Sequence, residues 1–594
     1  MIFGRHINKY YLHYAPMLLL GTAALFMVDF LQLIIPNLYQ MVINGMNRGV
    51  AEVNGQILAF DRSFLLDRIC MPMVGIILAI VVGRFLWRVM FFGAAIRVEA
   101  QLRNEMFDNA RRLSCEYYQV NKVGNLMSLF TNDLDTVQEC FGWGIMMFLD
   151  TLLMGVLAIA KMWRMDPVLT LLSLIPMAFL LASATIVGRY MMIKWDARQE
   201  AFSKLSDFSQ ESFSGIAVIK AFVKEAKELM AFKALNLENE KANIDHTRAS
   251  VLLRILVTMF VESVICVILG YGGYLVFQGR FNAGELVEFI GYFNAVVWPI
   301  TAVSELIDMT SRGKASLERI SELLDAGPVV RDRQDALELQ NPQGGIRFQS
   351  LTFRYPDGEQ NVLTDITAEI APGEQVGLVG KTGSGKTTLV DLLLRTYNVE
   401  DGMIFLDGKD INSLTIKSVR NAFAYVPQDS FLFSDTIARN IAFCMPEDPI
   451  PREIENAAKM ADVDDNIRDF ASGYETVLGE RGITVSGGQK QRISIARALM
   501  KNAPVLVLDD SVSAVDSRTE KVILQNLREI RKGKTTILIA HRISTIQQMD
   551  KILYLENGHL AAAGSHRHLM ESCPGYRRMV ELQQLEEEGG ESHV

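Results

Sequence analysis

The stretch VLVLDDSVSAVD, residues 505–516, says more about the fold than any other part of the sequence. Its first four residues are apolar and two aspartates follow them, a pattern typical of a buried parallel strand with carboxylates at its carboxyl end. At such a strand tip Asp509 can serve as an indirect magnesium ligand, and Asp510 can orient an attacking water as a base. A strand that ends in two aspartates is a weak signal alone, so the flanking sequence has to support it.

A phosphate-binding pattern lies upstream of this strand. GKTGSGKT, residues 380–387, fits G-x-x-x-x-G-K-[ST], with the strand-like EQVGLVG before it and a predicted helix after it. Its glycines let the backbone point N–H groups at a phosphate, Lys386 neutralises phosphate oxygens, and Thr387 can hold Mg²⁺. The predicted nucleotide contacts from this region are Gly380, Lys381, Thr382, Gly383, Ser384, Gly385, Lys386, Thr387 and Thr388.

The chain divides into a membrane half and a nucleotide-binding half. From residue 346 short β-branched strands alternate with helices, which is typical of a mixed α/β domain over 346–580. A linker is expected at 326–345, and the acidic ending, 581–594, is expected to be a disordered tail. The fold class is therefore a six-helix, all-α transmembrane domain over 1–325 followed by an α/β P-loop domain.

Six membrane spans are predicted in the first half. Hydrophobic residues make up 49% of the chain, and the mean hydropathy of +0.17 reflects apolar runs that are concentrated before about residue 310. Crossing the bilayer as a helix takes about 20 mostly apolar residues. The predicted spans are 16–44, 71–96, 139–162, 167–193, 251–277 and 285–307.

Basic residues in the connections predict the orientation. The segments after the second and fourth spans are long and rich in Lys and Arg, so the positive-inside rule places them and both termini in the cytoplasm, with the chain in the cytoplasmic (inner) membrane. Each segment keeps helical spacing of apolar residues, which predicts two projecting helices joined by a turn. The turns are expected near 122–133 and 210–222, each with a short amphipathic helix that can contact a cytoplasmic surface.

Several ionisable residues fall inside the predicted spans. A charged side chain in lipid is costly and normally faces a cavity or a partner. Long side chains near helix ends can instead extend to the interface, so a structural and a substrate-contacting role both stay open. These residues are Asp29, Arg84, Arg88, Asp150, Arg254 and Glu262.

Charge and cysteine content exclude other classes of function. The formal net charge is −9 and no run of Lys or Arg is long enough to follow a phosphate backbone, so no nucleic-acid partner is expected. The six cysteines lie far apart, without metal-type or paired spacing, and are expected to be reduced thiols. The N-terminus has no pattern of a cleavable secretory signal.

The sequence VSGGQKQR, residues 485–492, adds a more specific resemblance. With it, the second half resembles the nucleotide-binding domain of an ABC transporter, in which Ser486, Gly487, Gly488 and Gln489 match the family's signature. The resemblance implies ATP and Mg²⁺ as cofactors. It also implies three further roles: Tyr355 stacks on adenine, Gln428 links the magnesium site to the membrane domain, and His541 is the switch that touches the γ-phosphate.

The order of the two halves is similar to that of exporter-type half-transporters. TNDLDTV and GIAVIKAF in the two cytoplasmic turns support this resemblance, which covers nearly the whole chain. In that family two nucleotide domains close head to tail, with each ATP between one subunit's phosphate loop and the other's signature. A chain with one of each is expected to dimerise with a second half-transporter.

Asp510 departs from the family pattern, which has glutamate at this position. One methylene less draws the carboxylate back by about a C–C bond, and a displacement near 1 Å can cost about 10²-fold in rate. ATP binding should be retained, while the rate of ATP hydrolysis should fall. Because the signature is intact, a heterodimer with a partner that carries the glutamate is predicted; the alternative is a homodimer that hydrolyses slowly.

The function that the resemblance implies is ATP-driven export of small amphipathic molecules, drug-like or lipid-like, across the cytoplasmic membrane. One alternative of the same architecture is import of a small chelate. Another, which Asp510 permits, is an ATP-gated channel or regulatory subunit that binds ATP and barely turns it over. The intact signature and His541 argue against a gate.

Overall fold

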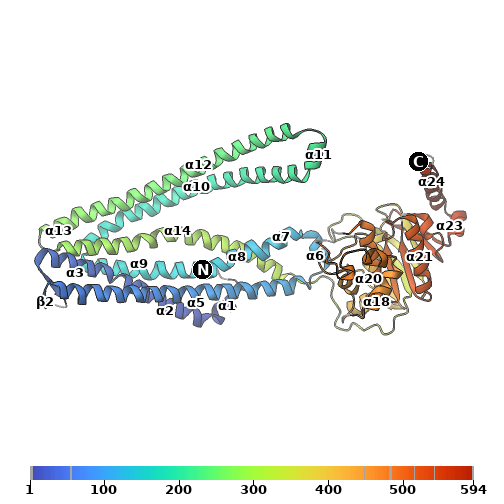
Figure 1. Cartoon of the computed structure of the whole chain (residues 1–594), viewed down its shortest axis with the longest axis horizontal. Coiled ribbons are helices and arrows are strands. Elements are labelled where there is room, and N and C mark those ends of the chain that lie inside the picture. Colours follow the sequence, from blue (N-terminus) through green and yellow to red (C-terminus); the bar gives the residue numbers. More distant parts are fainter. Residues whose placement is uncertain are drawn as a thin grey trace. The chain divides into compact units, whose positions relative to one another are not determined.

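The chain folds into two compact units, as a computed structural model shows (Figure 1). The structure describes residues 4–53, 56–446, 449–479, 485–513, 515–540 and 542–591. The first unit comprises Met1–Arg111 and Gly124–Ala326, and the second comprises Arg112–Val123 and Gly327–Val594. Each unit has its own core, and each is described by itself.

The first unit is entirely helical apart from a two-stranded hairpin. Its helices are α1 (Asn8–His13), α2 (Ala15–Gln32), α3 (Ile35–Arg48), α4 (Arg62–Phe64), α5 (Met71–Ala110), α8 (Leu134–Glu139), α9 (Ile145–Met165), α10 (Pro167–Ser214), α11 (Ile216–Ala221), α12 (Glu225–Val267), α13 (Gly273–Phe277) and α14 (Ala283–Asp325). The hairpin is β1 (Val50–Val53) paired with β2 (Gln56–Ala59). Short π-helical turns join several of these helices into longer rods.

Within the part of the chain that the structure describes, five helical segments are long and apolar enough to cross a membrane. They are Ala15–Arg48, Arg62–Ala110, Val123–Met165, Glu225–Phe277 and Ala283–Asp325. A sixth segment, α10, begins with a shorter apolar run, Pro167–Phe179. These segments contain the six predicted spans, so the first half is a helical transmembrane domain, as predicted.

The last predicted span contains acidic residues, and local hydrogen bonds explain how its helix accommodates them. Asn282 and Glu285 make a reciprocal capping box at the start of α14. Buried Glu288 accepts hydrogen bonds from Tyr292 Oη at 2.6 Å and from Asn37 Nδ2 at 3.1 Å. The carboxylates are therefore used inside the bundle or at the helix end.

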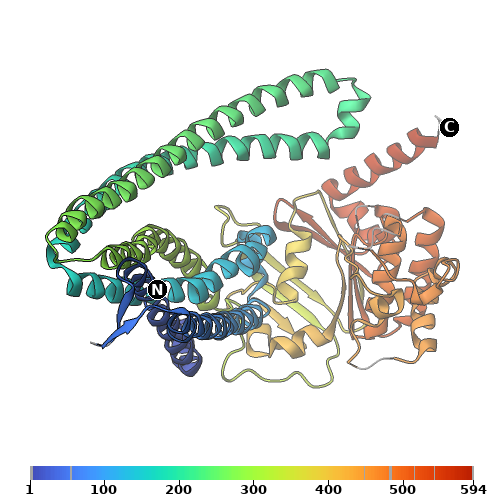
Figure 2. The same cartoon turned by 60° about the vertical axis from the view of Figure 1, so that its left-hand side comes forward.

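The second of the two turns that were predicted to be cytoplasmic lies where the sequence predicts it. Helices α10 and α12 run side by side and α11 caps them at the tip of the hairpin (Figure 2). Phe213, Ile216, Val218, Phe222 and Val223, at and around α11, are exposed. The tip of this hairpin therefore carries an apolar surface.

The predicted position of the first turn is wrong by about ten residues. The chain leaves the helix at Arg111 and forms the short helix α6 (Cys115–Val120), while 123–133, where the turn was predicted, is helical and includes α7 (Val123–Ser128). An isolated glycine such as Gly124 can be tolerated inside a helix. Helix α6 belongs to the second unit, where Ser114 Oγ accepts a hydrogen bond from the Val330 N–H at 2.9 Å.

The second unit contains two sheets. The larger has the strand order β12 (His559–Gly564), β11 (Lys551–Glu556), β5 (Gln375–Gly380), β10 (Thr535–Ile539), β9 (Val505–Asp509) and β8 (Phe423–Val426). The smaller has the order β4 (Leu363–Ile370), β3 (Ile346–Phe353), β6 (Ile404–Leu406) and β7 (Lys409–Asp410). The helices are α15 (Lys386–Leu393), α16 (Ile416–Ala422), α17 (Ile437–Ala442), α18 (Pro451–Met460), α19 (Asp464–Arg468), α20 (Gly487–Lys501), α21 (Ser517–Ile530), α22 (Ile543–Ile546), α23 (His566–Ser572) and α24 (Pro574–Glu591).

Strands β5, β10, β9 and β8 are parallel neighbours. Every residue of β9 and β10 is buried, as expected for central strands that helices cover on both faces. Because parallel strands end at the same edge of a sheet, the segments after Gly380, Val426 and Asp509 meet there. This edge carries the candidate site.

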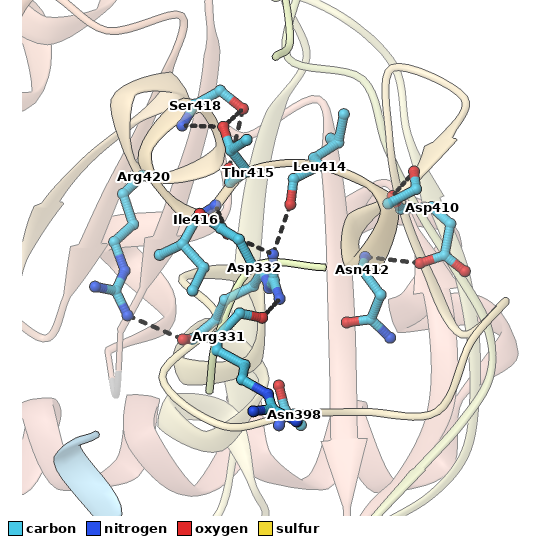
Figure 3. Close-up of polar contacts among 12 residues, drawn as sticks. Arg331, Asp332, Asn398, Asp410, Asn412, Leu414, Thr415, Ile416, Ser418 and Arg420 are labelled. Carbon is cyan, nitrogen blue, oxygen red and sulfur yellow. Dashed lines mark hydrogen bonds and ion pairs between the residues drawn. The ribbon is translucent and has the colours of Figure 1, made fainter. Parts of the chain in front are cut away.

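The linker, 326–345, is held against the second unit (Figure 3). Arg395, only 3% exposed, donates to Leu414 O at 2.6 Å and to Arg331 O at 3.3 Å. Asp332 Oδ1 accepts from the Ile416 N–H at 2.7 Å. The first part of the linker is thus fixed by one half-buried and one exposed hydrogen bond.

Replacing Arg395 with methionine should destabilise the second unit by about 2 kcal/mol, because the carbonyl groups that it satisfies lose a charged donor. Thermal unfolding of the full chain in detergent measures this loss. Arg333→Gln is the matched control, since its ion pair with Asp401 is exposed and should contribute little to stability. Equal effects of the two substitutions would contradict the assignment.

The described part of the acidic ending, 581–591, is helical, contrary to the predicted disorder. Helix α24 continues to Glu591, with Tyr576 and Val580 buried in the core of the second unit. Packing of the first turns extends the helix into a sequence that is too polar to fold alone. The sequence prediction considered only the charges and did not include the buried contacts of Tyr576 and Val580.

Candidate nucleotide-binding site

A cavity of about 220 Å³ opens at the carboxyl edge of the larger sheet. It is lined by Val362, Thr382, Gly383, Gly385, Lys386, Thr387, Thr388, Gln428 and Asp509. All but Val362 were predicted from the sequence. Val362 lies just before β4, in a segment without a recognisable motif.

The phosphate loop has a backbone that needs glycine. Gly383 and Gly385 have φ values of +82° and +95°, in the left-handed region that L side chains rarely adopt. A Cβ on Gly380 would lie 2.2 Å from Leu555 O, so this position also has no room for a side chain. The loop leads into α15, whose N-terminus favours an anion.

Lys386 is buried at the start of α15. Its Nζ donates to Gly380 O at 2.9 Å and to Lys381 O at 3.0 Å. Burial lowers the pKa of Lys386, while the nearby carboxylates of Asp509 and Asp510 act in the opposite direction. The loop thus presents a positive charge beside the cavity.

Three oxygen donors that could hold a cation line the same cavity: the hydroxyl of Thr387, the amide of Gln428 and the carboxylate of buried Asp509. Magnesium prefers such oxygen donors, together with water and phosphate oxygens. Burial and then Asp509 raise the pKa of Asp391 to about 6. Negative charge is therefore concentrated behind the cavity, and the donor set fits Mg²⁺.

Asp391 was not predicted as part of this site. It lies on α15, five residues after Lys386, in a run of apolar residues that gives no sign of a function. Asp391 adds negative charge to the site only because α15 lies close to β9. The spacing of residues in the sequence does not reveal this proximity.

Asp510 follows β9 in a left-handed conformation, with φ at 47°. Aspartate tolerates this conformation better than most residues do. Its N–H donates to Ile539 O at 3.0 Å, and its carbonyl oxygen accepts from Ser513 Oγ at 2.8 Å. The side chain is half-buried and is not among the residues that line the cavity.

Tyr355 lies beside the phosphate loop. Its hydroxyl is 2.9 Å from Thr388 Oγ1, and its ring packs edge-on against Phe353 and Tyr397. Burial raises the pKa of Tyr355. An aromatic ring fixed in this way can serve as a stacking surface for a base.

Tyr355→Ala should weaken ATP binding about tenfold, because stacking of a base on an aromatic ring contributes about 1–3 kcal/mol. Titration of the full chain with a fluorescent ATP analogue measures the affinity. Tyr355→Phe removes only the hydroxyl contact with Thr388 and should bind nearly as well as the unaltered chain. If both variants lose affinity equally, the ring has no stacking role.

The signature segment starts helix α20. Ser486 Oγ accepts from the Gln489 N–H at 3.3 Å, and Gln489 Oε1 accepts from the Ser486 N–H at 3.0 Å. This capping box leaves Ser486 and Gly487 exposed, while Gly488 and Gln489 are half-buried. None of the four is among the residues that line the cavity, so the structure does not bring the chain's own signature to its own phosphate loop.

Three predicted residues, Gly380, Lys381 and Ser384, belong to the loop without lining the cavity; Lys381 is exposed, and Gly380 and Ser384 are buried. His541, predicted as the γ-phosphate switch, lies outside the described residues.

Comparisons with known proteins support the same division of the chain. The family described as "ABC transporter transmembrane region" matches residues 18–300, and the family described as "ABC transporter" matches 363–513. The probable multidrug resistance ABC transporter ATP-binding/permease protein YheI of Bacillus subtilis (strain 168) is 35% identical over 590 residues, covering 99% of this chain and 98% of the relative. The chain belongs to the ABC transporter family. The multidrug resistance-like ATP-binding protein MdlA of Escherichia coli (strain K12) is also 35% identical to this ABC transporter, over 95% of the chain and 94% of the relative.

A solved structure extends this result to the fold. The structure of a bacterial Atm1-family ABC exporter with ATP bound has a TM-score of 0.77 and 26% identity to this ABC transporter, and covers 97% of the chain and 98% of its own. The transporter therefore combines a transmembrane and an ATP-binding domain in an exporter fold, and ATP-driven export is its general activity.

Proposed function

We propose that this ABC transporter is one half of a heterodimeric exporter of amphipathic small molecules, with both termini on the cytoplasmic side of the inner membrane. The observation that carries this proposal is the composition of the nucleotide cavity. Phosphate-loop residues line it, and the exposed signature residues Ser486 and Gly487 do not. In a dimer, the second subunit would supply its signature residues to this cavity. The signature residues of this chain would complete the nucleotide cavity of the second subunit.

Exposed apolar surfaces are consistent with a partner. Around α11 they include Phe213, Phe222 and Val223. On the second unit Phe433 and Phe443 stack at 4.6 Å between ring centroids and are partly exposed. Such surfaces are costly in water and mark sites of protein contact. In the proposed dimer the α11 tip of one subunit docks on the nucleotide unit of the other.

Asp510 favours a heterodimer over a homodimer. A shorter carboxylate, set back from the cavity, would orient a water poorly while leaving the phosphate loop able to bind ATP. The partner would carry the longer carboxylate at its own site. A homodimer that turns over slowly is the second candidate, and Asp510 is also the observation that permits it.

Different residues bind the phosphates, the base and the metal ion of the nucleotide. Loop N–H groups and Lys386 bind and orient the phosphates, and Tyr355 orients the base. Thr387, Gln428 and Asp509 would hold Mg²⁺, which neutralises charge on the phosphates when bound. Closure of the two nucleotide units would exclude water from the site and move the attached helices.

ATPase rates of the purified chain, alone and with candidate partner half-transporters, test the proposal. The chain alone should be nearly inactive, and a partner that carries glutamate should raise the rate by about tenfold or more. Asp510→Asn should leave the rate of that pair almost unchanged. Brisk turnover by the chain alone that Asp510→Asn abolishes would instead establish the homodimer.

A further inference from the structure

The segment that follows β10 leaves the larger sheet at the edge that carries the nucleotide cavity. Strand β10 lies between β5 and β9 and runs parallel to both. Ile539, the last residue of β10, accepts a hydrogen bond from the Asp510 N–H at 3.0 Å. The N–H of the next residue, Ala540, donates to Leu378 O of β5 at 3.4 Å. Because the carboxyl ends of parallel strands meet at one edge, the chain after Ala540 starts between the phosphate loop and the segment that begins at Asp510.

The short helix α22 comes next in the chain, and other elements anchor it. A helix of four residues, Ile543–Ile546, is too short to hold its own place. Ile546 is fully buried against β5, where a Cβ on Gly377 would lie 2.9 Å from Ile546 Cβ. The N–H of Ile543 donates to Gln583 Oε1 of α24 at 2.9 Å. The position of α22 thus depends on its neighbours, and one of them, α21, supplies a buried carboxylate.

Glu520 on α21 is that carboxylate. It is only 7% exposed, and its Oε1 accepts a hydrogen bond from the hydroxyl of Thr545, which is 3% exposed. Its Oε2 lies 3.6 Å from Nη1 of Arg542, whose side chain is half exposed. Burial of a carboxylate is costly unless other groups satisfy it, and these two groups belong to one segment. Glu520 therefore holds α22 and the residue before it against α21.

Glu520 does not line the nucleotide cavity, so an effect on the nucleotide has to pass through the segment that it holds. That segment is short, because a single residue, His541, separates Ala540 from Arg542 in the chain. His541 lies outside the described residues, and the sequence resemblance assigns it the contact with the γ-phosphate. Hydrogen bonds to a phosphate depend on distance and angle, so the anchors on both sides decide whether this contact can form.

We propose that Glu520 is a positioning residue for the terminal phosphate of ATP. Through Thr545 it fixes α22, and α22 fixes the chain that leads back to β10 at the edge with the nucleotide cavity. ADP lacks this phosphate. Loss of Glu520 should therefore weaken the binding of ATP and leave the binding of ADP unchanged. The inference needs only nucleotide binding, so it does not depend on the proposed heterodimer.

The affinities of the purified full chain for ATP and for ADP, each with Mg²⁺, test this role. Displacement of a fluorescent nucleotide analogue gives both values. Glu520→Leu removes the acceptor for Thr545 and keeps a side chain of similar size, so ATP binding should weaken about tenfold while ADP binding stays unchanged. Thr545→Val removes the donor and should have the same effect. In the double variant the loss should be no larger than in either single variant, because both substitutions remove one interaction.

Two further variants separate positioning from general stability. Glu520→Gln keeps an oxygen acceptor for Thr545 and should retain most of the ATP affinity, because the ion pair with Arg542 is partly exposed. Glu529→Leu makes the same change at an exposed position of α21 and should leave both affinities unchanged. Equal losses for ATP and ADP in Glu520→Leu would show a purely structural role, and an unchanged ATP affinity would show no role in binding. Either result overturns the inference.

Discussion

Replacing Asp510 with glutamate should raise hydrolysis at this chain's own ATP site by about 10²-fold. The reason is distance: one added methylene carries the carboxylate about a C–C bond further toward the cavity, and positioning errors near 1 Å cost about 10²-fold. The measurement needs a background in which the partner's site is silent, so the partner's catalytic glutamate is first changed to glutamine. ATP turnover of this pair is then compared with and without Asp510→Glu.

The control for this experiment is Asp510→Asn in the same background, which should stay as inactive as the unaltered chain. Nucleotide affinity should be equal in all three proteins, because Asp510 does not line the cavity. If glutamate leaves turnover unchanged while ATP binds normally, the shortened side chain is not the limiting feature, and the argument for a heterodimer loses its basis.

Removal of the Lys386 ammonium should weaken ATP binding by about 10²-fold. Lys386→Ala deletes the charged donor that is buried beside the phosphate loop, and charged hydrogen bonds contribute about 1.5–3 kcal/mol. A fluorescent ATP analogue titrated into the full chain reads the change directly.

Lys381→Ala provides the matched control. Lys381 is in the same loop, but its side chain is exposed and does not line the cavity, so the affinity should change less than threefold. Similar losses for Lys381→Ala and Lys386→Ala would mean that net charge near the loop, and not the placement of one ammonium group, controls binding.

The nucleotide site was predictable because its parts depend on local sequence. The glycines of 380–385 are needed for backbone conformations, and Asp509 follows an apolar run that is typical of a buried strand. Parallel strands then bring both segments to one edge of the sheet. The membrane spans were predictable for a similar reason, since their length and apolar content are local properties.

Features that depend on packing were not predictable. The predicted first turn at 122–133 is mostly helical, and the described part of the acidic ending is helical because Tyr576 and Val580 anchor α24. The sequence marked Asp29 and Asp150 as costly in a membrane, but 121 positions separate them, and only the packing of α2 against α9 places both beside one cavity of the first unit.

The most direct test of the central claim is ATP-driven accumulation of a fluorescent amphipathic dye in inside-out membrane vesicles that contain this chain and a partner. The account predicts uptake against the dye's gradient that requires both subunits and falls sharply when Lys386→Ala is present. Dye movement that only follows its gradient, or that continues unchanged in Lys386→Ala vesicles, would contradict an ATP-driven pump.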